Sequence, residues 1–182
     1  GRNSVSNNVS AINLLNIKRV GRRNNNMQWV KLPPKIYFER NSIRYLIDMK
    51  EMEKAMIITD RGMYNLGYVA KIEDAIKRRR NNVDIELFFD VEPDPSVETV
   101  QKGVELMNKF NPDVIIALGG GSSMDAAKVM WLLHEHPEVN FDDIKQKFMD
   151  IRKRAFKFPE LGKKTRLICI PTTSDQKLLH LP

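Results

Sequence analysis

Two kinds of hydrophobic pattern alternate along the chain after Pro33 and Pro34. Short runs that are almost wholly apolar lie at residues 55–59 (AMIIT), 114–118 (VIIAL) and 166–170 (RLICI). The segments between them carry apolar residues at the spacing of an amphipathic helix. Nearly continuous apolar strands separated by such helices are typical of a parallel sheet that helices cover on both faces. The pattern therefore predicts an α/β fold with a Rossmann-like, mostly parallel sheet.

The same rules place the remaining elements. We expect two more strands at residues 36–38 and 84–89, and helices at residues 43–50, 69–80, 95–110 and 122–133. Asp94 and Pro95 should begin the third of these helices, because proline is favoured at the first helical position. The apolar stripes that should face the core are Val69, Ile72, Ala75 and Ile76; Val97, Val100, Val104 and Met107; and Met124, Ala127 and Trp131 beside Ala126, Met130 and Leu133.

Residues 1–33 differ from the rest of the chain, since polar, asparagine-rich sequence surrounds a single apolar patch, AINLLNI. Residues 27–32 (MQWVKL) alternate apolar and polar positions like an edge strand, and Trp29 needs a partner to bury it. We interpret residues 1–33 as an extended linker or docking arm, and residues 34–174 as one domain.

The charge is positive, because 30 Lys and Arg against 23 Asp and Glu give a formal charge of +7. The excess is concentrated in residues 18–23 (KRVGRR), 77–80 (KRRR) and 152–157 (RKRAFK). A basic surface attracts anions, including nucleic acid. KRRR, however, ends a helical pattern, where cations favour both the helix dipole and water, and we expect these side chains to be solvated. No aromatic-rich motif accompanies the basic runs, so we rank nucleic-acid binding last.

The lone cysteine excludes an internal disulfide framework and is typical of a reducing compartment. Cys169 lies in the apolar run LICI and is expected to be a small buried core residue. No apolar stretch approaches the roughly 18 residues that a transmembrane helix requires, and the sequence does not start with a signal-peptide pattern. We therefore expect a cytoplasmic protein that does not contact the membrane.

Gly119, Gly120 and Gly121 lie between the apolar run VIIAL and a helix. Glycines let a backbone turn sharply and approach a ligand, and the helix start at Ser122 favours an anion, above all a phosphate. The string GGGSSM is neither a complete GxGxxG fingerprint nor a P-loop. A tight glycine turn without a ligand stays open as the alternative. Asp125 and Lys128 are either near the anion or an ordinary ion pair on the helix.

Asp60 follows the apolar run AMIIT directly. A carboxylate at the end of a buried strand can accept hydrogen bonds from ribose hydroxyls and would repel a 2′-phosphate, which suits NAD better than NADP. A helix N-cap before Arg61 is the equally plausible alternative. His134 and His136 are unsuited to share a metal ion, because side chains at i and i+2 diverge on a helix, and we expect both to lie on the surface.

Several strings resemble the iron-containing alcohol dehydrogenase family: PPKIYFE, IITD, EPDPS, GGGSSMDAAKVMW, FMDIRKR and IPTTS. They are most similar to the alcohol dehydrogenase half of the bifunctional aldehyde-alcohol dehydrogenases, in order from about Ile12 to Ser174. The segment from INLLNIKRV to PPKIYFE resembles the connection between the two halves of those enzymes.

The resemblance implies a dehydroquinate synthase-like, NAD-binding N-terminal domain. Carried over by position, Gly119, Gly120, Gly121 and Ser122 would hold the pyrophosphate, and Asp125 and Lys128 would support that loop. Asp60 would meet the adenosine ribose. Asp94, Thr172 and Thr173 would line the adenine and ribose parts of the cleft. The family interconverts aldehydes and alcohols with NAD and iron; acetaldehyde and ethanol are the expected substrates, in a homo-oligomer.

The sequence departs from the family pattern after Ser174, where DQKLLHLP replaces a Gly-Thr-Gly-Ser-Glu type stretch. We interpret residues 175–182 as a foreign or aberrant tail. The helical iron-binding domain and its metal ligands have no counterpart, so we expect no catalytic or metal-binding residue in this chain and no activity of the chain alone. An assembly module that acts through the N-terminal arm is the alternative function.

Overall fold

The structure is a computed structural model that describes residues 35–37, 39–139 and 160–172. The proposed linker arm with Trp29, two of the three basic runs, Thr173 and the proposed tail lie outside the described residues. The chain separates into two compact units, Gly1–Ser42 and Ile43–Pro182, and the fold belongs to the second unit.

The second unit is built on one sheet of four parallel strands, β1 (Lys54–Ile58), β2 (Asp84–Phe88), β3 (Val114–Gly119) and β4 (Arg166–Pro171), in the order β2-β1-β3-β4. Ala55 of β1 pairs with Ile85 of β2 on one side and with Val114 of β3 on the other. This arrangement confirms the predicted parallel sheet. β1, β3 and β4 correspond to the three apolar runs of the sequence, and β2 corresponds to the strand expected at residues 84–89.

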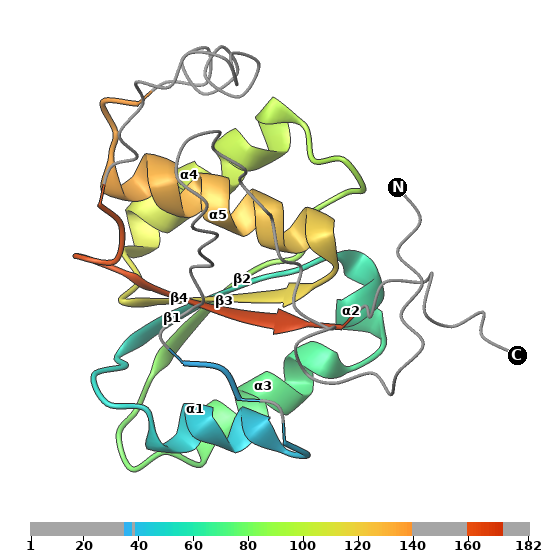
Figure 1. The fold of residues 1–182 in the computed structure, drawn as a ribbon, viewed down its shortest axis with the longest axis vertical. Helices are drawn as coiled ribbons and strands as arrows, with labels where there is room; N and C mark the ends of the chain where they lie inside the picture. The colour runs from blue at the N-terminus through green and yellow to red at the C-terminus, as the bar shows by residue number, and fades with distance from the viewer. Residues whose placement is uncertain (1–34, 38, 140–159, 173–182) are drawn as a thin grey trace, which may run out of the picture. The chain divides into compact units, whose positions relative to one another are not determined.

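Helices cover both faces of the sheet. They are α1 (Tyr45–Asp48), which follows a short 3-10 turn at Ser42–Arg44, α2 (Arg61–Asn65), α3 (Tyr68–Lys77), α4 (Val97–Phe110) and α5 (Gly121–Glu135). In Figure 1 the helices α4 and α5 lie on one face of the sheet and α1 and α3 on the other. None of the helices described here is long and apolar enough to cross a membrane.

The two faces of the sheet carry separate hydrophobic cores because successive side chains of a strand point to opposite sides. Ile57 and Ile116 belong to the core shared with α1 and α3, whereas Met56 and Ile115 belong to the core shared with α4 and α5. All four side chains are fully buried. Burial of each stabilises the fold by about 1.5–3 kcal/mol.

Two predicted elements differ from the structure, one in its existence and one in its first residue. No strand occurs at Ile36 and Tyr37, which are exposed, and Phe38 lies outside the described residues. The helix expected from Asp94 and Pro95 begins at Val97, which is itself exposed rather than part of the core stripe.

The later start of α4 has a local cause. Ser96 is the N-cap, and its hydroxyl oxygen accepts a hydrogen bond from the backbone N–H of Thr99 at 3.2 Å. Glu92 completes the cap, since its carboxylate accepts hydrogen bonds from the Ser96 backbone N–H at 2.9 Å and from the Thr99 hydroxyl at 2.8 Å. The Ser96 cap thus satisfies one of the first N–H groups of α4, which have no partner within the helix.

The basic run KRRR is only partly solvated. Helix α3 ends at Lys77, and the half-buried Arg79 returns to α1, where its guanidinium donates hydrogen bonds to the carbonyl oxygens of Leu46, Ile47 and Met49. The last carbonyls of a helix have no partner within the helix. Arg79 supplies partners at the end of α1, so the expectation that all four cations face water is wrong.

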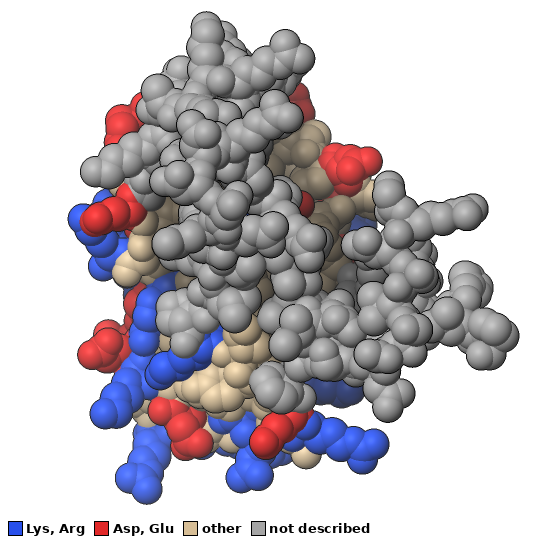
Figure 2. Space-filling model, in the orientation of Figure 1, with Lys and Arg blue, Asp and Glu red and all other residues tan. Residues whose placement is uncertain are grey.

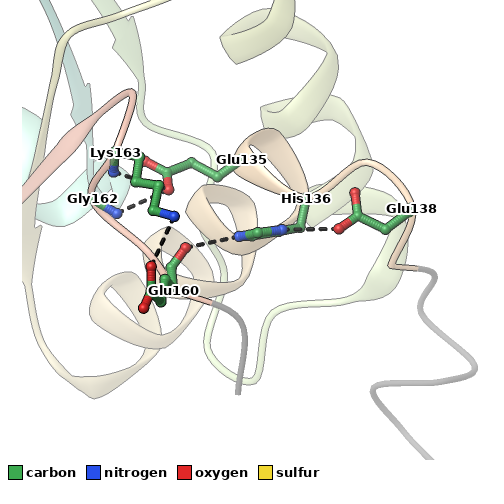
Figure 3. Close-up of polar contacts among 6 residues, drawn as sticks. All are labelled: Glu135, His136, Glu138, Glu160, Gly162 and Lys163. Atoms are coloured by element: carbon green, nitrogen blue, oxygen red, sulfur yellow. Dashed lines mark hydrogen bonds and ion pairs between the residues drawn. The ribbon is translucent and has the colours of Figure 1, made fainter. Parts of the chain in front are cut away.

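Glu135, at the end of α5, anchors the segment that leads into β4 (Figure 3). Its carboxylate accepts hydrogen bonds from the backbone N–H groups of Gly162, Lys163, Lys164 and Thr165 at 2.9, 3.4, 3.2 and 3.0 Å. Burial alone raises the pKa of the Glu135 carboxyl, but these hydrogen bonds outweigh burial, and its pKa lies below the ordinary value. The lowered pKa favours the ionised carboxylate, and in this form Glu135 holds the segment that leads into β4.

Two expectations about exposure are also wrong. His134 is buried, not on the surface, because the end of α5 packs on α4, where His134 Nδ1 lies 2.6 Å from Asn108 Oδ1. Cys169 is exposed rather than buried, because β4 is an edge strand of the described sheet. His134 and His136 contact different partners, as their spacing predicts.

Candidate functional site

The order of the strands reverses between β1 and β3. From β1 the chain first adds β2 on one side and then returns to add β3 and β4 on the other. In open parallel sheets, ligands bind beyond the carboxyl ends of the strands at such a switch point. Asp60 follows β1 and the three glycines end β3 and begin α5. The topology therefore brings the two sequence clues to one place, although they are about sixty residues apart.

Hydrogen bonds tie the strand ends together at this edge. The Thr59 hydroxyl donates to the Leu118 carbonyl oxygen at 2.8 Å, and the Thr59 backbone N–H donates to the Phe88 carbonyl oxygen at 2.9 Å. Thr172, which was predicted to line the cleft, donates its backbone N–H to the Gly119 carbonyl oxygen at 3.0 Å. The base of the site is thus a continuation of the hydrogen bonding of the sheet.

Asp60 is a helix N-cap, as one of its two interpretations proposed. Its Oδ1 accepts a hydrogen bond from the Met63 backbone N–H at 2.9 Å, which caps α2. Its Oδ2 lies 3.3 Å from the Ser123 hydroxyl oxygen, which donates from the first turn of α5. Each carboxylate oxygen can accept a further hydrogen bond, and the side chain is half-buried at the pocket edge. The cap leaves the ribose interpretation open.

The three glycines have different roles. Gly119 has φ +136°, and a Cβ there would lie 2.8 Å from Ser123 Oγ and 3.1 Å from Asp60 Oδ2. Glycine at this position therefore lets β3, α5 and Asp60 meet closely. Gly120 is the N-cap of α5, and a Cβ on the following Gly121 would meet nothing within 4 Å. Gly121 thus borders open space at the helix start.

The start of α5 is the electropositive end of a 15-residue helix. The first N–H groups of a helix have no partner within the helix, and Gly120 has no side chain to accept from them. Asp60 and Ser96 supply such side-chain caps to α2 and α4. Of α2, α4 and α5, the last has the N-terminus best suited to an external anion.

A pocket of about 420 Å³ lies at this edge of the sheet. Its walls come from the segments after β1 and β2 and from the first turn of α5: Asp60, Arg61, Gly62, Asp90, Val91, Glu92, Pro93, Ser122 and Ser123. The other predicted site residues within the described ranges do not line it: Asp94, Gly119, Gly120, Gly121, Asp125, Lys128 and Thr172. Asp94 follows Pro93 and is exposed, with φ +52°.

The pocket contains charged residues that the sequence analysis did not identify. The Arg61 guanidinium donates to Asp90 Oδ1 through both Nε, at 2.9 Å, and Nη2, at 2.7 Å. The N–H of Ser96 and the hydroxyl of Thr99 lower the pKa of the Glu92 carboxyl to about 2. Arg61 and Asp90 directly follow Asp60 and the run DIELFF, so a systematic search of strand ends would have found them.

Asp125 and Lys128 form the ordinary ion pair that was one of their two interpretations. Lys128 Nζ lies 3.3 Å from Asp125 Oδ1, three residues apart on α5, and both side chains are more than half exposed. No group of three or more His, Cys, Asp or Glu side chains among the described residues could hold a metal ion. The part of the chain seen here does not fit an iron site.

Figure 2 shows how charge is distributed on one face of the molecule. Lys and Arg side chains gather over the region of α1 and α3, but Asp and Glu side chains lie between them. Mixed charge of this kind differs from the continuous basic stripe that typically follows a nucleic-acid backbone. The ranking of nucleic acid as the last candidate ligand stays a prediction.

Comparisons with known proteins give a consistent result. The sequence model of the iron-containing alcohol dehydrogenases matches residues 33–175. The chain is 66% identical over 174 residues to aldehyde-alcohol dehydrogenase 2 of Entamoeba histolytica, which covers 96% of this chain and 20% of that protein. It is 43% identical over 143 residues to the NADPH-dependent butanol dehydrogenase of Clostridium saccharobutylicum, a match that covers 79% of this chain and 34% of that protein.

The fold comparison agrees with the sequence comparison. An iron-containing alcohol dehydrogenase from Thermococcus thioreducens superposes with a TM-score of 0.63 at 30% identity, over 73% of this chain and 34% of that one. The chain spans about a fifth of the length of the aldehyde-alcohol dehydrogenases that it matches.

Proposed function

The chain belongs to the iron-containing alcohol dehydrogenase family, and we propose that residues 34–174 are the NAD(H)-binding domain of an enzyme that interconverts acetaldehyde and ethanol. Residues 1–33 would join this domain to an aldehyde dehydrogenase half. One observation carries the proposal: Asp60 lines one pocket at the switch point of the sheet together with Ser122 and Ser123, which directly follow the three glycines.

The pyrophosphate of the nucleotide would bind at the start of α5. Gly119, Gly120, Gly121 and Ser122 would supply a close backbone approach and N–H donors, supported by Asp125 and Lys128 from the next turn. The open space at Gly121 and the glycine N-cap support this assignment, because a ligand oxygen could accept from N–H groups that no cap side chain reaches.

The adenosine end would lie toward β1 and β2. Asp60 would accept hydrogen bonds from the ribose hydroxyls, and Asp94, Thr172 and Thr173 would line the adenine and ribose parts of the cleft. The spare lone pairs of the Asp60 carboxylate support this role. Its charge would disfavour a 2′-phosphate by about 1 to 4 kcal/mol for unit charges 4 Å apart. We therefore propose NAD as the cofactor, although one relative is named NADPH-dependent.

The bound nucleotide supplies the hydride for carbonyl reduction. This chain would bind and orient the nucleotide, whereas iron would be held elsewhere in the intact enzyme. We place that enzyme in the cytoplasm as a homo-oligomer without nucleic-acid or membrane contacts. Small aldehydes and alcohols would be its substrates.

Calorimetric titration of the purified chain with NADH and with NADPH tests the proposal. Asp60→Asn keeps an N-cap side chain but removes the charge, because Asn caps helices about as well as Asp. We expect the unsubstituted chain to prefer NADH, and Asp60→Asn to reduce that preference by about tenfold, equivalent to about 1.4 kcal/mol.

Asp84→Asn is the matched control. Asp84 is an exposed carboxylate at the start of β2, whereas the pocket lies beyond the carboxyl ends of the strands. It should leave the preference unchanged. If the folded chain binds neither nucleotide, or if both substitutions change the preference equally, the proposed function is wrong.

A further inference from the structure

A second charged pair lies at the pocket, directly beside Asp60. Both Nε and Nη2 of Arg61 donate to a single oxygen of Asp90, at 2.9 and 2.7 Å. The Arg61 guanidinium carbon lies 5.8 Å from the centroid of the Phe89 ring, and that ring stacks on Tyr64 at a centroid distance of 4.9 Å. Arg61 is thus held toward the segment that comes after β2.

A free arginine at this position would have the opposite effect on nucleotide choice from Asp60. The guanidinium presents donors in a fixed fork that binds phosphate oxygens in pairs. An arginine near the ribose-binding acid accommodates the 2′-phosphate of NADP in dinucleotide-binding folds. In this structure Asp90 occupies the Nε and Nη2 edge of that fork and compensates its charge.

The pair is nevertheless easy to open. The side chains of Arg61 and Asp90 are 74% and 55% exposed, and exposed ion pairs contribute little to stability. Arg61 is therefore restrained but not locked, so removing Asp90 should release it with little effect on the fold.

We propose that Asp90 is a specificity-determining residue, which reinforces the preference for NADH by holding Arg61 away from a 2′-phosphate. This inference rests on the proposed function, since it assumes that the adenosine ribose binds beside Asp60. Asp60 would reject the 2′-phosphate directly, and Asp90 would withhold the cation that could accept it.

The test is a double-mutant cycle on NADH and NADPH affinity, measured by calorimetry. Asp90→Ala should raise NADPH affinity about fivefold relative to NADH affinity, the effect of an exposed ion pair at its upper limit. The same substitution in an Arg61→Ala background should give no relative gain, because the cation that it releases is absent. Glu160→Ala removes another exposed, ion-paired carboxylate, at the opposite edge of the sheet, and should leave the ratio unchanged.

The outcomes separate the two proposals. An equal gain with and without Arg61 would mean that Asp90 acts only through its own negative charge, and an unchanged ratio in Asp90→Ala would mean that it has no influence on nucleotide choice. Either result would overturn the inference while NADH binding stands. If the folded, unsubstituted chain binds neither nucleotide, the proposed function fails, and this inference fails with it.

Discussion

The two ends of helix α5 differ in whether the chain supplies a hydrogen-bond acceptor for the backbone N–H groups located there. At its start, Gly120 provides no side-chain cap, Gly121 borders open space, and the pocket lies beside Ser122 and Ser123. At its end, Glu135 accepts hydrogen bonds from a whole run of backbone N–H groups that leads into β4. The start of α5 leaves backbone N–H groups for a ligand, whereas at its end Glu135 satisfies backbone N–H groups from within the chain.

This difference separates stability from function along a single helix. Successive backbone N–H groups such as those that Glu135 satisfies can bind an anion such as phosphate, but here the chain supplies its own carboxylate. The start of α5 has similar electrostatics, but the nearby Asp60 carboxylate accepts from the Ser123 hydroxyl, and no side-chain cap from Gly120 reaches the first N–H groups of the helix. Substitutions at the end of α5 should therefore change the free energy of unfolding, and substitutions at its start should change nucleotide affinity.

The largest expected effect is at Glu135. Glu135→Gln replaces a carboxylate by an amide, which has one acceptor oxygen and places an NH₂ group toward N–H donors. Hydrogen bonds to charged groups contribute more than neutral ones, so we expect the free energy of unfolding to fall by on the order of 3 kcal/mol. Urea denaturation would measure the loss.

The control for this prediction is Glu160→Gln. Glu160 lies in the same region, and its carboxylate forms an exposed ion pair with Lys163 at 2.8 Å. Its loss should cost less than about 1 kcal/mol. If both substitutions destabilise the chain equally, Glu135 is not the anchor of this end.

Two alanine substitutions in the glycine run should separate packing from binding. Gly119→Ala forces a side chain into a left-handed conformation and against Ser123 Oγ, so we expect a loss of about 2 kcal/mol of stability. Gly121→Ala meets no atom within 4 Å and should change stability by less than about 1 kcal/mol. Its methyl group would instead obstruct the pyrophosphate and lower NADH affinity by about tenfold.

Denaturation and calorimetry on both variants check this pair. Gly121→Ala is the more informative, because a stable variant with unchanged NADH affinity would show that the start of α5 is not the nucleotide site. A stable Gly119→Ala would contradict the close packing of β3, α5 and Asp60.

The sequence alone was sufficient for the sheet but not for the details of its edges. The runs that became β1 and β3 are buried on both faces, and such continuous apolar runs, separated by amphipathic helices, are typical of a covered parallel sheet. Helix boundaries were harder: Ser96 begins α4 because Glu92 and Thr99 complete its cap, and hydrogen bonds of that kind do not appear in hydrophobic spacing. Burial of His134 likewise depends on α4, a separate element.

The same difference applies to the site: single residues were predictable from local sequence, but their spatial arrangement was not. Asp60 and the glycines were identifiable because each directly follows an apolar run and belongs to a family motif. Their proximity depends on the strand order, which local patterns do not specify. The pairing of Arg61 with Asp90 joins the ends of two strands, and so it became visible only when β1 and β2 were placed side by side.

The smallest expected effect is a pH dependence at the end of α5, where His136 contacts two acceptors (Figure 3). Its Nδ1 lies 2.9 Å from Glu138 Oε1, and its Nε2 lies 2.9 Å from the Glu160 carbonyl oxygen. Only the charged ring has a proton on both nitrogens, so both contacts require imidazolium. The Glu160 carbonyl, then Glu138, raise the pKa of His136 above its ordinary value.

Because the pKa of His136 is raised on folding, its contribution is complete below the ordinary value of 6.5 and disappears as pH rises through the folded-state pKa. His136→Gln should therefore destabilise the chain more at about pH 5.5 than at about pH 8.5, as measured by urea denaturation. Glu138→Gln, which removes the nearby negative charge, should reduce this difference between the two pH values. Equal destabilisation at both pH values would mean that His136 acts here as a neutral ring, with only one of its nitrogens donating.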